Sequence, residues 1–320
     1  MTMRKDFCAF ILTHGRPDRV LTHKALRSHG YTGPIRLIVD NEDGAIDQYR
    51  EAYGKDVVIF DKAAMAPSVD TGDNFPERRG VVYARNACFD IAKWLGFRYF
   101  IQLDDDYDRF NYKRNPAGDY VEKRLTNLDE VLGLMLDYFI SVPSLLSIAM
   151  GQNGDYPGGK LCVTDPVGVW IGPKRKCMNS FICSTERPFR FVGRINEDCN
   201  TYVDAGSRGG LFMTVGCVAL CQRRTQAHEG GMTELYLDNG TYVKSFYSVL
   251  YQPSAARIAL LPQSFDSQRI HHLIRWRNAV PLILSETHRK ASLRQAVKPA
   301  RKKSKHDAIT KTQTDRAARD

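Results

Sequence analysis

Short apolar strands that alternate with helices dominate the first hundred residues of this chain. The four predicted strands are residues 7–12, 35–39, 57–60 and 99–103. Their continuous apolar character is typical of strands that are covered on both faces. Helices are expected over 18–28 and 76–93, because both segments present an apolar stripe and are followed by a glycine. This order predicts an α/β fold with a mainly parallel sheet flanked by helices.

The pattern changes after about residue 125. A helix is expected over 127–140, and residues 141–262 mix short strands with glycine-rich loops. We therefore expect a smaller antiparallel extension there, followed by one more helix over 267–279. Ligands of doubly wound sheets bind beyond the carboxyl ends of the strands, so the first half should hold the principal binding site.

Most of the net charge of +10 lies at the C-terminal end. Residues 289–320 contain 11 Lys and Arg against three Asp, and from residue 298 onward they show no apolar periodicity. Such a segment is typically flexible and suits binding to a polyanion such as DNA. The expected organisation is one domain over 1–290, with halves of about 1–125 and 126–290, and a flexible basic tail over 291–320.

Several classes of protein are excluded by what the sequence lacks. The longest apolar stretch, 132–150, is interrupted by Asp137 and Pro143, and a membrane span needs about 20 apolar residues. The N-terminal apolar run has no small-residue cleavage site and is better interpreted as a strand. The eight cysteines form no CxxC pair, so we expect reduced thiols in a cytoplasmic protein, with structural zinc as the alternative.

Three adjacent carboxylates, Asp104, Asp105 and Asp106, follow the fourth predicted strand directly. Adjacent carboxylates repel one another, which costs stability unless a cation compensates them. Side chains alternate along extended chain, so Asp104 and Asp106 should point to the same side and share a divalent ion. Oxygen ligands favour Mg²⁺ or Mn²⁺. The alternative is a solvated turn whose aspartates cap a helix.

Further polar residues are expected at the same edge of the sheet. Thr13, His14 and Arg16 follow the first strand, and Asp40 ends the second, where it can accept hydrogen bonds from a nucleobase or ribose. Arg85 lies on the helix before the acidic triplet, and its planar guanidinium suits a diphosphate. The alternatives are a turn residue for Asp40 and a solvated helix face for Arg85.

The ordered segments FAILTHGRPDR, IRLIVDNED, YARN and FIQLDDDY resemble the nucleotide-sugar half of GT-A type glycosyltransferases. A DxD motif in that fold holds a divalent ion against the donor diphosphate. More narrowly, residues 6–262 resemble the phage-encoded TET-associated glycosyltransferases, which attach sugars to 5-hydroxymethylcytosine in DNA. The resemblance implies a GT-A fold with a donor half and an acceptor half, a UDP-sugar donor, and the cytoplasm of the host as location.

The resemblance also implies roles for individual residues. Asp104 would contact the ribose or the metal, and Asp106 would ligate Mn²⁺ or Mg²⁺. Arg85 would face the diphosphate, and Asp40 the uracil or ribose. The donor-binding residues are then Thr13, His14, Arg16, Asp40, Arg85 and Asp104. Many enzymes of this type add a histidine to the metal site, and His228 is the candidate, with His271 and His272 as rivals.

The motif GRINED at residues 193–198 resembles the acidic motif that inverting GT-A enzymes place beneath the acceptor hydroxyl. Asp198 is then the candidate base. An alcohol is a poor nucleophile near neutral pH, so a carboxylate within hydrogen-bond distance should remove its proton. Glu197 is the alternative base. The alternative without catalysis is a surface cap of a helix that begins near Glu197.

The acceptor is the least specified partner. A basic surface beside Asp198 is expected from six residues: Lys174, Arg175, Lys176, Arg187, Arg190 and Arg194. The aromatic residues Trp170, Phe181, Phe189 and Phe191 suit stacking on a flipped base, although core packing is their more ordinary role. Two alternatives remain: a glycosyltransferase that acts on a glycan or protein, and a non-catalytic nucleic-acid-binding protein. The sequence leaves open the sugar, the strandedness of the DNA and the oligomeric state.

Overall fold

A computed structural model describes residues 2–153, 171–172, 176–222, 235, 240, 243–264 and 267–281 of the chain. The chain divides into a compact unit over Met1–Leu282 and a second unit over Ile283–Asp320. The second unit, with the predicted basic tail and the predicted domain boundary near residue 290, lies outside the described residues.

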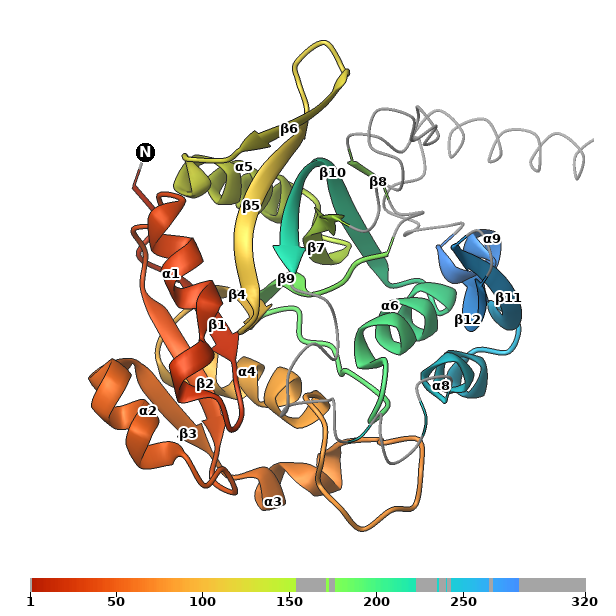
Figure 1. The fold of residues 1–320 in the computed structure, drawn as a ribbon, viewed down its shortest axis with the longest axis horizontal. Coiled ribbons are helices and arrows are strands. Elements are labelled where there is room, and N and C mark those ends of the chain that lie inside the picture. Colours follow the sequence, from red (N-terminus) through yellow and green to blue (C-terminus); the bar gives the residue numbers. More distant parts are fainter. Residues whose placement is uncertain are drawn as a thin grey trace, which may run out of the picture. The chain divides into compact units, whose positions relative to one another are not determined.

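A ten-stranded sheet forms the centre of the unit (Figure 1). Its strands are β1 (Phe7–Leu12), β2 (Ile35–Asp40), β3 (Val57–Phe60), β4 (Tyr99–Asp104), β5 (Tyr107–Arg114), β6 (Tyr120–Arg124), β7 (Leu145–Gln152), β8 (Ile171–Gly172), β9 (Ser180–Ser184) and β10 (Leu211–Gln222). The order is β3-β2-β1-β4-β9-β7-β10-β5-β6, and β8 pairs with β10. A separate antiparallel pair is formed by β11 (Ala256–Ser264) and β12 (Ser267–Ile274).

The first four strands run parallel, as the sequence predicts. Leu12 of β1 is level with Ile38 of β2 and with Asp104 of β4, so the carboxyl ends of these strands meet at one edge. Beyond β4 the sheet is mixed: β9 is antiparallel to β4, β10 is parallel to β7, and β5 is antiparallel to β10. The predicted class, a flanked α/β sheet with an antiparallel extension, is confirmed.

Helices cover both faces of the sheet (Figure 1). They are α1 (Leu21–Ser28), α2 (Ile46–Tyr53), α3 (Lys62–Met65), α4 (Val82–Trp94), α5 (Leu128–Ser141), α6 (Glu197–Ser207), α8 (Lys244–Tyr251) and α9 (Trp276–Ala279), with 3-10 turns at Pro17–Arg19, Gly54–Asp56 and Ala66–Ser68. On one face, Phe7, Ala9 and Ile11 pack with α1, α2 and α5. The alternate residues Cys8 and Phe10 pack with α4 and α6 on the other face. Burial on both faces explains why these strands are continuously apolar.

Two predicted helices differ from the structure. The helix expected over 76–93 begins only at Val82, because Gly80 adopts a φ of +124° that ends the preceding loop. The helix expected over 267–279 is instead strand β12 followed by the short α9. Apolar residues at 270, 273 and 274 fit helical spacing, but pairing with β11 along most of the strand determines the conformation.

Two further findings concern the expectations about membranes and thiols. No helix within the described ranges is long and apolar enough to cross a bilayer. The seven cysteines that the structure describes are all free, and six of them are buried. The eighth, Cys162, lies outside the described residues. Burial raises the pKa of several of these thiols, including that of Cys8 to about 12, which favours the protonated, unreactive form.

Candidate active site

The acidic triplet occupies the turn between β4 and β5, at the edge where the parallel strands end. Asp104 is the last residue of β4. Its Oδ1 accepts a hydrogen bond of 2.8 Å from Arg85 Nη2, and its Oδ2 accepts one of 3.0 Å from the Tyr107 hydroxyl. The Asp104 side chain is 25% exposed. It is therefore partly open to a ligand while being held from two sides.

Asp106 is half-buried, and only one of its oxygens is paired with a described residue. Gln222 Nε2 of β10 donates to Oδ2 at 3.0 Å, whereas Oδ1 has no partner in the described part of the chain. Burial and repulsion from Asp104 raise the pKa of Asp106 to about 7. An unpartnered buried carboxylate oxygen is costly, and a hard divalent cation would remove that cost. Asp106 therefore fits a metal ligand.

The described residues do not supply a complete set of metal ligands. Within the described ranges, no group of three or more His, Cys, Asp or Glu residues is placed to hold a metal ion. Mg²⁺ and similar ions need only one or two carboxylates when water and substrate phosphates supply the other ligands. The predicted third ligand, His228, lies outside the described residues. Asp104 and Asp106 thus suit a cation that is completed by the substrate.

Asp105, the middle member, has partners of its own, and the sequence indicated no role for it. It accepts hydrogen bonds from Thr13 Oγ1 at 2.7 Å and from Arg16 Nη2 at 2.8 Å. Thr13 Oγ1 also lies 2.8 Å from the Tyr49 hydroxyl. Burial raises the pKa of Asp105 to about 6 despite these partners. Asp105 therefore ties the loop after β1 to the triplet.

A second polar group lies at the end of β2. Asp40 is buried, and its Oδ2 lies 2.8 Å from His14 Nδ1, while its Oδ1 lies 3.3 Å from Lys62 Nζ. Burial opposes ionisation of Asp40, but His14 and Lys62 outweigh it and lower the pKa of this carboxyl. The same hydrogen bond raises the pKa of His14. Lys62 was missed, because no local pattern links α3 to the end of β2.

The acceptor-side acids begin α6, as expected, but they do not form a surface cap. Asn196 precedes the helix with a φ of +62°, an unusual conformation for a residue with a side chain. Glu197 Oε1 accepts from Arg85 Nε at 2.7 Å, and Asp198 Oδ1 accepts from the Cys199 backbone N–H at 2.6 Å. Both acids are only 6% exposed. Burial raises the pKa of Asp198, and raises that of Glu197 to about 7.

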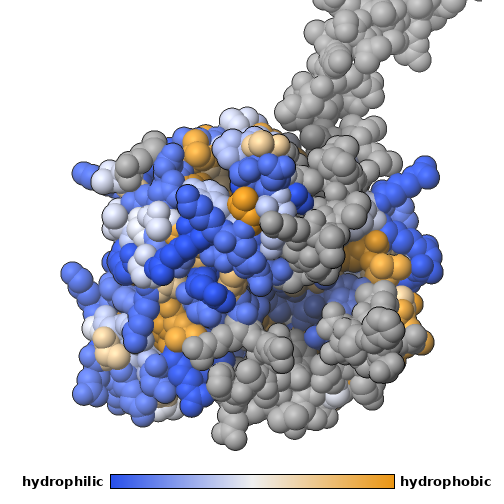
Figure 2. All heavy atoms as spheres, turned by 45° about the horizontal axis from the view of Figure 1, so that its top comes forward, coloured by the Kyte–Doolittle hydropathy of each residue, from blue (hydrophilic) through white to orange (hydrophobic). Residues whose placement is uncertain are grey.

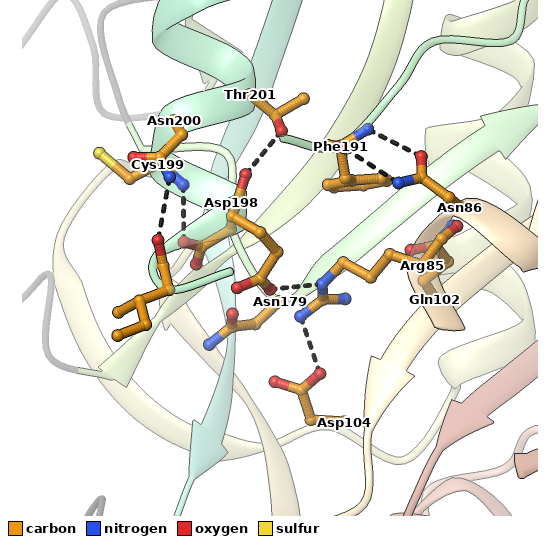
Figure 3. Close-up of polar contacts among 12 residues, drawn as sticks. Arg85, Asn86, Gln102, Asp104, Asn179, Phe191, Asp198, Cys199, Asn200 and Thr201 are labelled. Carbon is orange, nitrogen blue, oxygen red and sulfur yellow. Dashed lines mark hydrogen bonds and ion pairs between the residues drawn. The ribbon is translucent and has the colours of Figure 1, made fainter. Parts of the chain in front are cut away.

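Arg85 connects the two groups of carboxylates (Figure 3). It is almost fully buried rather than on a solvated helix face, and its guanidinium bonds Glu197 through Nε and Asp104 through Nη2. Its centre lies 5.5 Å from the Phe181 ring and 5.7 Å from the Phe191 ring. No described residue pairs with Nη1. The structure thus places Arg85 between the end of β4 and the start of α6.

Side-chain hydrogen bonds fix the segment that leads into α6 (Figure 3). Asn86 of α4 bonds both the N–H and the C=O of Phe191, each at 2.9 Å. Thr201 donates to the Glu197 carbonyl, and Asn200 bonds carbonyls of the loop before the helix. The sequence indicated no role for these three residues, although Asn86 is adjacent to Arg85 in the YARN segment.

Other predicted site residues lie elsewhere. Arg194 is buried, and Arg187 bonds three backbone carbonyls and stacks on Phe139, so they do not extend a basic surface as expected. Phe181, Phe189 and Phe191 are core residues, in agreement with their ordinary role. His271 and His272 lie buried in β12. Three positions fall outside the described residues: Trp170, Lys174 and Arg175.

Comparison with known proteins adds a family match and distant structural neighbours. A family model described as TET-Associated Glycosyltransferase matches residues 7–231, more than half of the chain. A comparison with curated proteins gave no match. Glucosyl-3-phosphoglycerate synthase from Mycobacterium tuberculosis, crystallised with Mg²⁺ and UDP, is 12% identical with a TM-score of 0.43, covering 84% of this chain and 87% of its own. Mannosyl-3-phosphoglycerate synthase from Rubrobacter xylanophilus is 12% identical with a TM-score of 0.42, covering 84% and 86%.

Proposed function

This chain belongs to the TET-associated glycosyltransferase family, and from that premise we propose that it transfers a sugar from a UDP-sugar to 5-hydroxymethylcytosine in DNA. Membership makes it a nucleotide-sugar-dependent glycosyltransferase, which removes the alternative of a non-catalytic binding protein. The observation that carries the finer proposal is the position of Arg85 between Asp104 and Glu197. It brings a donor-side carboxylate and the acceptor-side acids to one buried centre.

On the donor side, Asp104 and Asp106 would hold Mn²⁺ or Mg²⁺. The unpartnered Oδ1 of Asp106 and the partial exposure of Asp104 support this assignment. When bound, such a cation would offset the negative charge of the departing diphosphate. Thr13, His14, Arg16 and Asp40 would border the donor at the ends of β1 and β2. Asp105 holds Thr13 and Arg16 in place, and His14 and Asp40 bond each other.

On the acceptor side, Asp198 would act as the base. Glu197 Oε1 is occupied by the Arg85 guanidinium, and this bond opposes the increase in proton affinity that burial gives Glu197. Asp198 has only the Cys199 backbone N–H as a bonded donor among the described residues. It would take the hydroxymethyl proton while oxygen bonds to the anomeric carbon and the bond from that carbon to the diphosphate breaks. Attack from the face opposite the leaving group inverts that carbon.

The test is mass spectrometry of nucleosides from DNA incubated with the protein, Mn²⁺ and a panel of UDP-sugars. We expect a gain of one sugar mass on 5-hydroxymethylcytosine and none on cytosine in a matched oligonucleotide. Saccharide and peptide acceptors are tested in parallel. Transfer to these acceptors but not to DNA would replace the proposed acceptor while leaving the glycosyltransferase assignment intact.

A further inference from the structure

The loop of residues 70–79 joins the two elements that build the candidate site. It leads directly toward α4, which carries Arg85. Its first residues also bond the segment before α6: Gly193 N–H donates to the Asp70 carbonyl at 2.8 Å, and Arg194 N–H donates to the Thr71 carbonyl at 2.8 Å. Loop 70–79 therefore connects to the site in two ways, through the chain to α4 and through backbone hydrogen bonds to the segment before α6.

The Arg194 guanidinium holds this loop in one conformation. Arg194 is 1% exposed. Nε and Nη2 each donate to Asp73 at 2.8 Å, Nη2 also donates to the Phe75 carbonyl at 3.1 Å, and Nη1 donates to the carbonyls of Glu77 and Arg79. All five N–H groups of the guanidinium are thus used within the loop. The Tyr247 hydroxyl of α8 adds a 2.7 Å hydrogen bond to Asp73.

Phe75 projects from this fixed loop with 56% of its surface exposed. Its N–H donates to Asp73 Oδ1 at 3.1 Å, and its C=O accepts from Arg194, so the backbone is held on both sides. Exposed apolar residues are ordinary when scattered, and small hydrophobic patches are scattered over the face in Figure 2. The unusual combination is an exposed ring on a backbone held by a buried ion pair, because such an arrangement lowers the entropic cost of binding.

We propose that Phe75 stacks on a nucleobase of the acceptor DNA, next to the modified base. This inference rests on the proposed function. Asp198 is buried, so a hydroxymethyl group reaches it only when its base leaves the helical stack. The neighbouring base then lacks a stacking partner, which an aromatic side chain from a loop beside the site replaces.

Two arginines that follow Phe75 support a nucleic acid rather than an apolar partner. Arg78 is 40% exposed and pairs with Glu42, and Arg79 is 37% exposed and pairs with Glu77. Exposed ion pairs contribute little stability, so backbone phosphates compete readily for these guanidinium groups. An aromatic ring with adjacent cations matches the alternation of bases and phosphates along a strand.

The test compares Phe75→Ala with the wild-type protein on two acceptors, an oligonucleotide with one 5-hydroxymethylcytosine and the free 5-hydroxymethylated nucleotide. We expect kcat/KM on the oligonucleotide to fall roughly 5- to 150-fold, the range for loss of one stacked base. Activity on the free nucleotide should stay unchanged, since it has no neighbouring base. Phe75→Trp should retain activity on both acceptors. Trp94→Ala is the matched control, because Trp94 is 75% exposed at the other end of α4.

A binding measurement keeps the inference testable if the free nucleotide is a poor substrate. The fluorescence of 2-aminopurine placed beside the modified base is measured when the protein binds. Wild-type protein and Phe75→Trp should quench this fluorescence, and Phe75→Ala should not. Unchanged quenching or unchanged kcat/KM in Phe75→Ala would overturn the stacking role, as would an equal loss of UDP affinity. If the wild-type protein transfers sugar only to other acceptors, the proposed function fails together with this inference.

Discussion

The donor edge and the acceptor-side segment are assembled by different means. At the donor edge, parallel pairing of β1 with β2 and β4 brings Thr13, Asp40 and Asp104 to the same edge of the sheet, within two residues of one level. On the acceptor side, Glu197 and Asp198 are placed by side-chain hydrogen bonds from α4 and from the first turn of α6. Residues that strand register brings together can be predicted from the strand patterns in the sequence. Residues that side-chain hydrogen bonds bring together depend on tertiary contacts, which the sequence does not show.

Among the described residues, Arg85 links the two regions, because it forms ion pairs with both Asp104 and Glu197. Substitutions on the donor side should therefore change nucleotide binding, and those on the acceptor side should change transfer alone. Substitution of Arg85 should change both. Variants of Asp106, Asp198 and Arg85 test whether nucleotide binding and transfer can be changed independently. A variant of His14 tests a weaker contact within the donor edge.

Asp106→Ala should have the largest effect. It removes the carboxylate with the unpartnered buried oxygen, so turnover should fall by at least about a thousandfold, the loss expected when metal stabilisation of the leaving group disappears. Titration of UDP with and without Mn²⁺ provides the measurement. The affinity of the variant should no longer respond to Mn²⁺. Asp108→Asn, on β5 nearby, is the control, and a normal Mn²⁺ response in Asp106→Ala would contradict the metal assignment.

Asp198→Asn should reduce the transfer rate by about 10²- to 10⁴-fold, the usual contribution of a general base. Its affinity for UDP should stay at the wild-type value, because Asp198 does not touch the donor edge in the described structure. Glu197→Gln is the informative partner variant. If Glu197→Gln loses more of kcat than Asp198→Asn, then Glu197 is the base and the division of roles between the two acids is reversed.

Arg85→Met should weaken the fold and the site together. The substitution leaves Glu197 buried without its cation. Breaking a buried ion pair in this way should lower the free energy of unfolding by about 3–5 kcal/mol. Urea unfolding measures this loss. The double variant Arg85→Met/Glu197→Gln should recover part of the free energy of unfolding, because the buried charge is then gone. A double variant that is no more stable than Arg85→Met would mean that the pair is not coupled.

The contrast between the regions also explains which parts of the site could be predicted from the sequence. The four parallel strands were predicted because buried strands have a recognisable composition, and Asp40 and Asp104 followed as their last residues. The start of α6 was predicted from a motif, but Arg194 of that motif was expected at the surface. Its burial depends on loop 70–79, which lies more than a hundred residues away and carries no regular pattern.

The hairpin of β11 and β12 shows the same limit. Its apolar residues satisfy helical spacing locally, and only the opposing strand decides between the two conformations. Lys62 and Gln222 were missed for a related reason. Each meets its carboxylate, Asp40 or Asp106, from an element that is distant in sequence. Contacts of this kind become visible only when the chain is folded.

The smallest predicted effect concerns His14 and Asp40. Their hydrogen bond raises the pKa of His14 above its ordinary value of 6.5. The protonated pair therefore stabilises the fold below pH 6.5, and this contribution disappears as pH rises through the folded-state pKa. The His14 side chain is 47% exposed, so solvent screening should limit the contribution to less than about 1 kcal/mol.

Urea unfolding of His14→Gln and wild-type protein at pH 6 and pH 8.5 measures this contribution. The wild-type advantage should be present at pH 6 and nearly absent at pH 8.5. An advantage that grows with pH would show that neutral His14, acting as a simple hydrogen-bond donor, is the stabilising form. Because Lys62 also neutralises Asp40, loss of His14 should perturb the donor edge far less than loss of Arg85 perturbs the acceptor side.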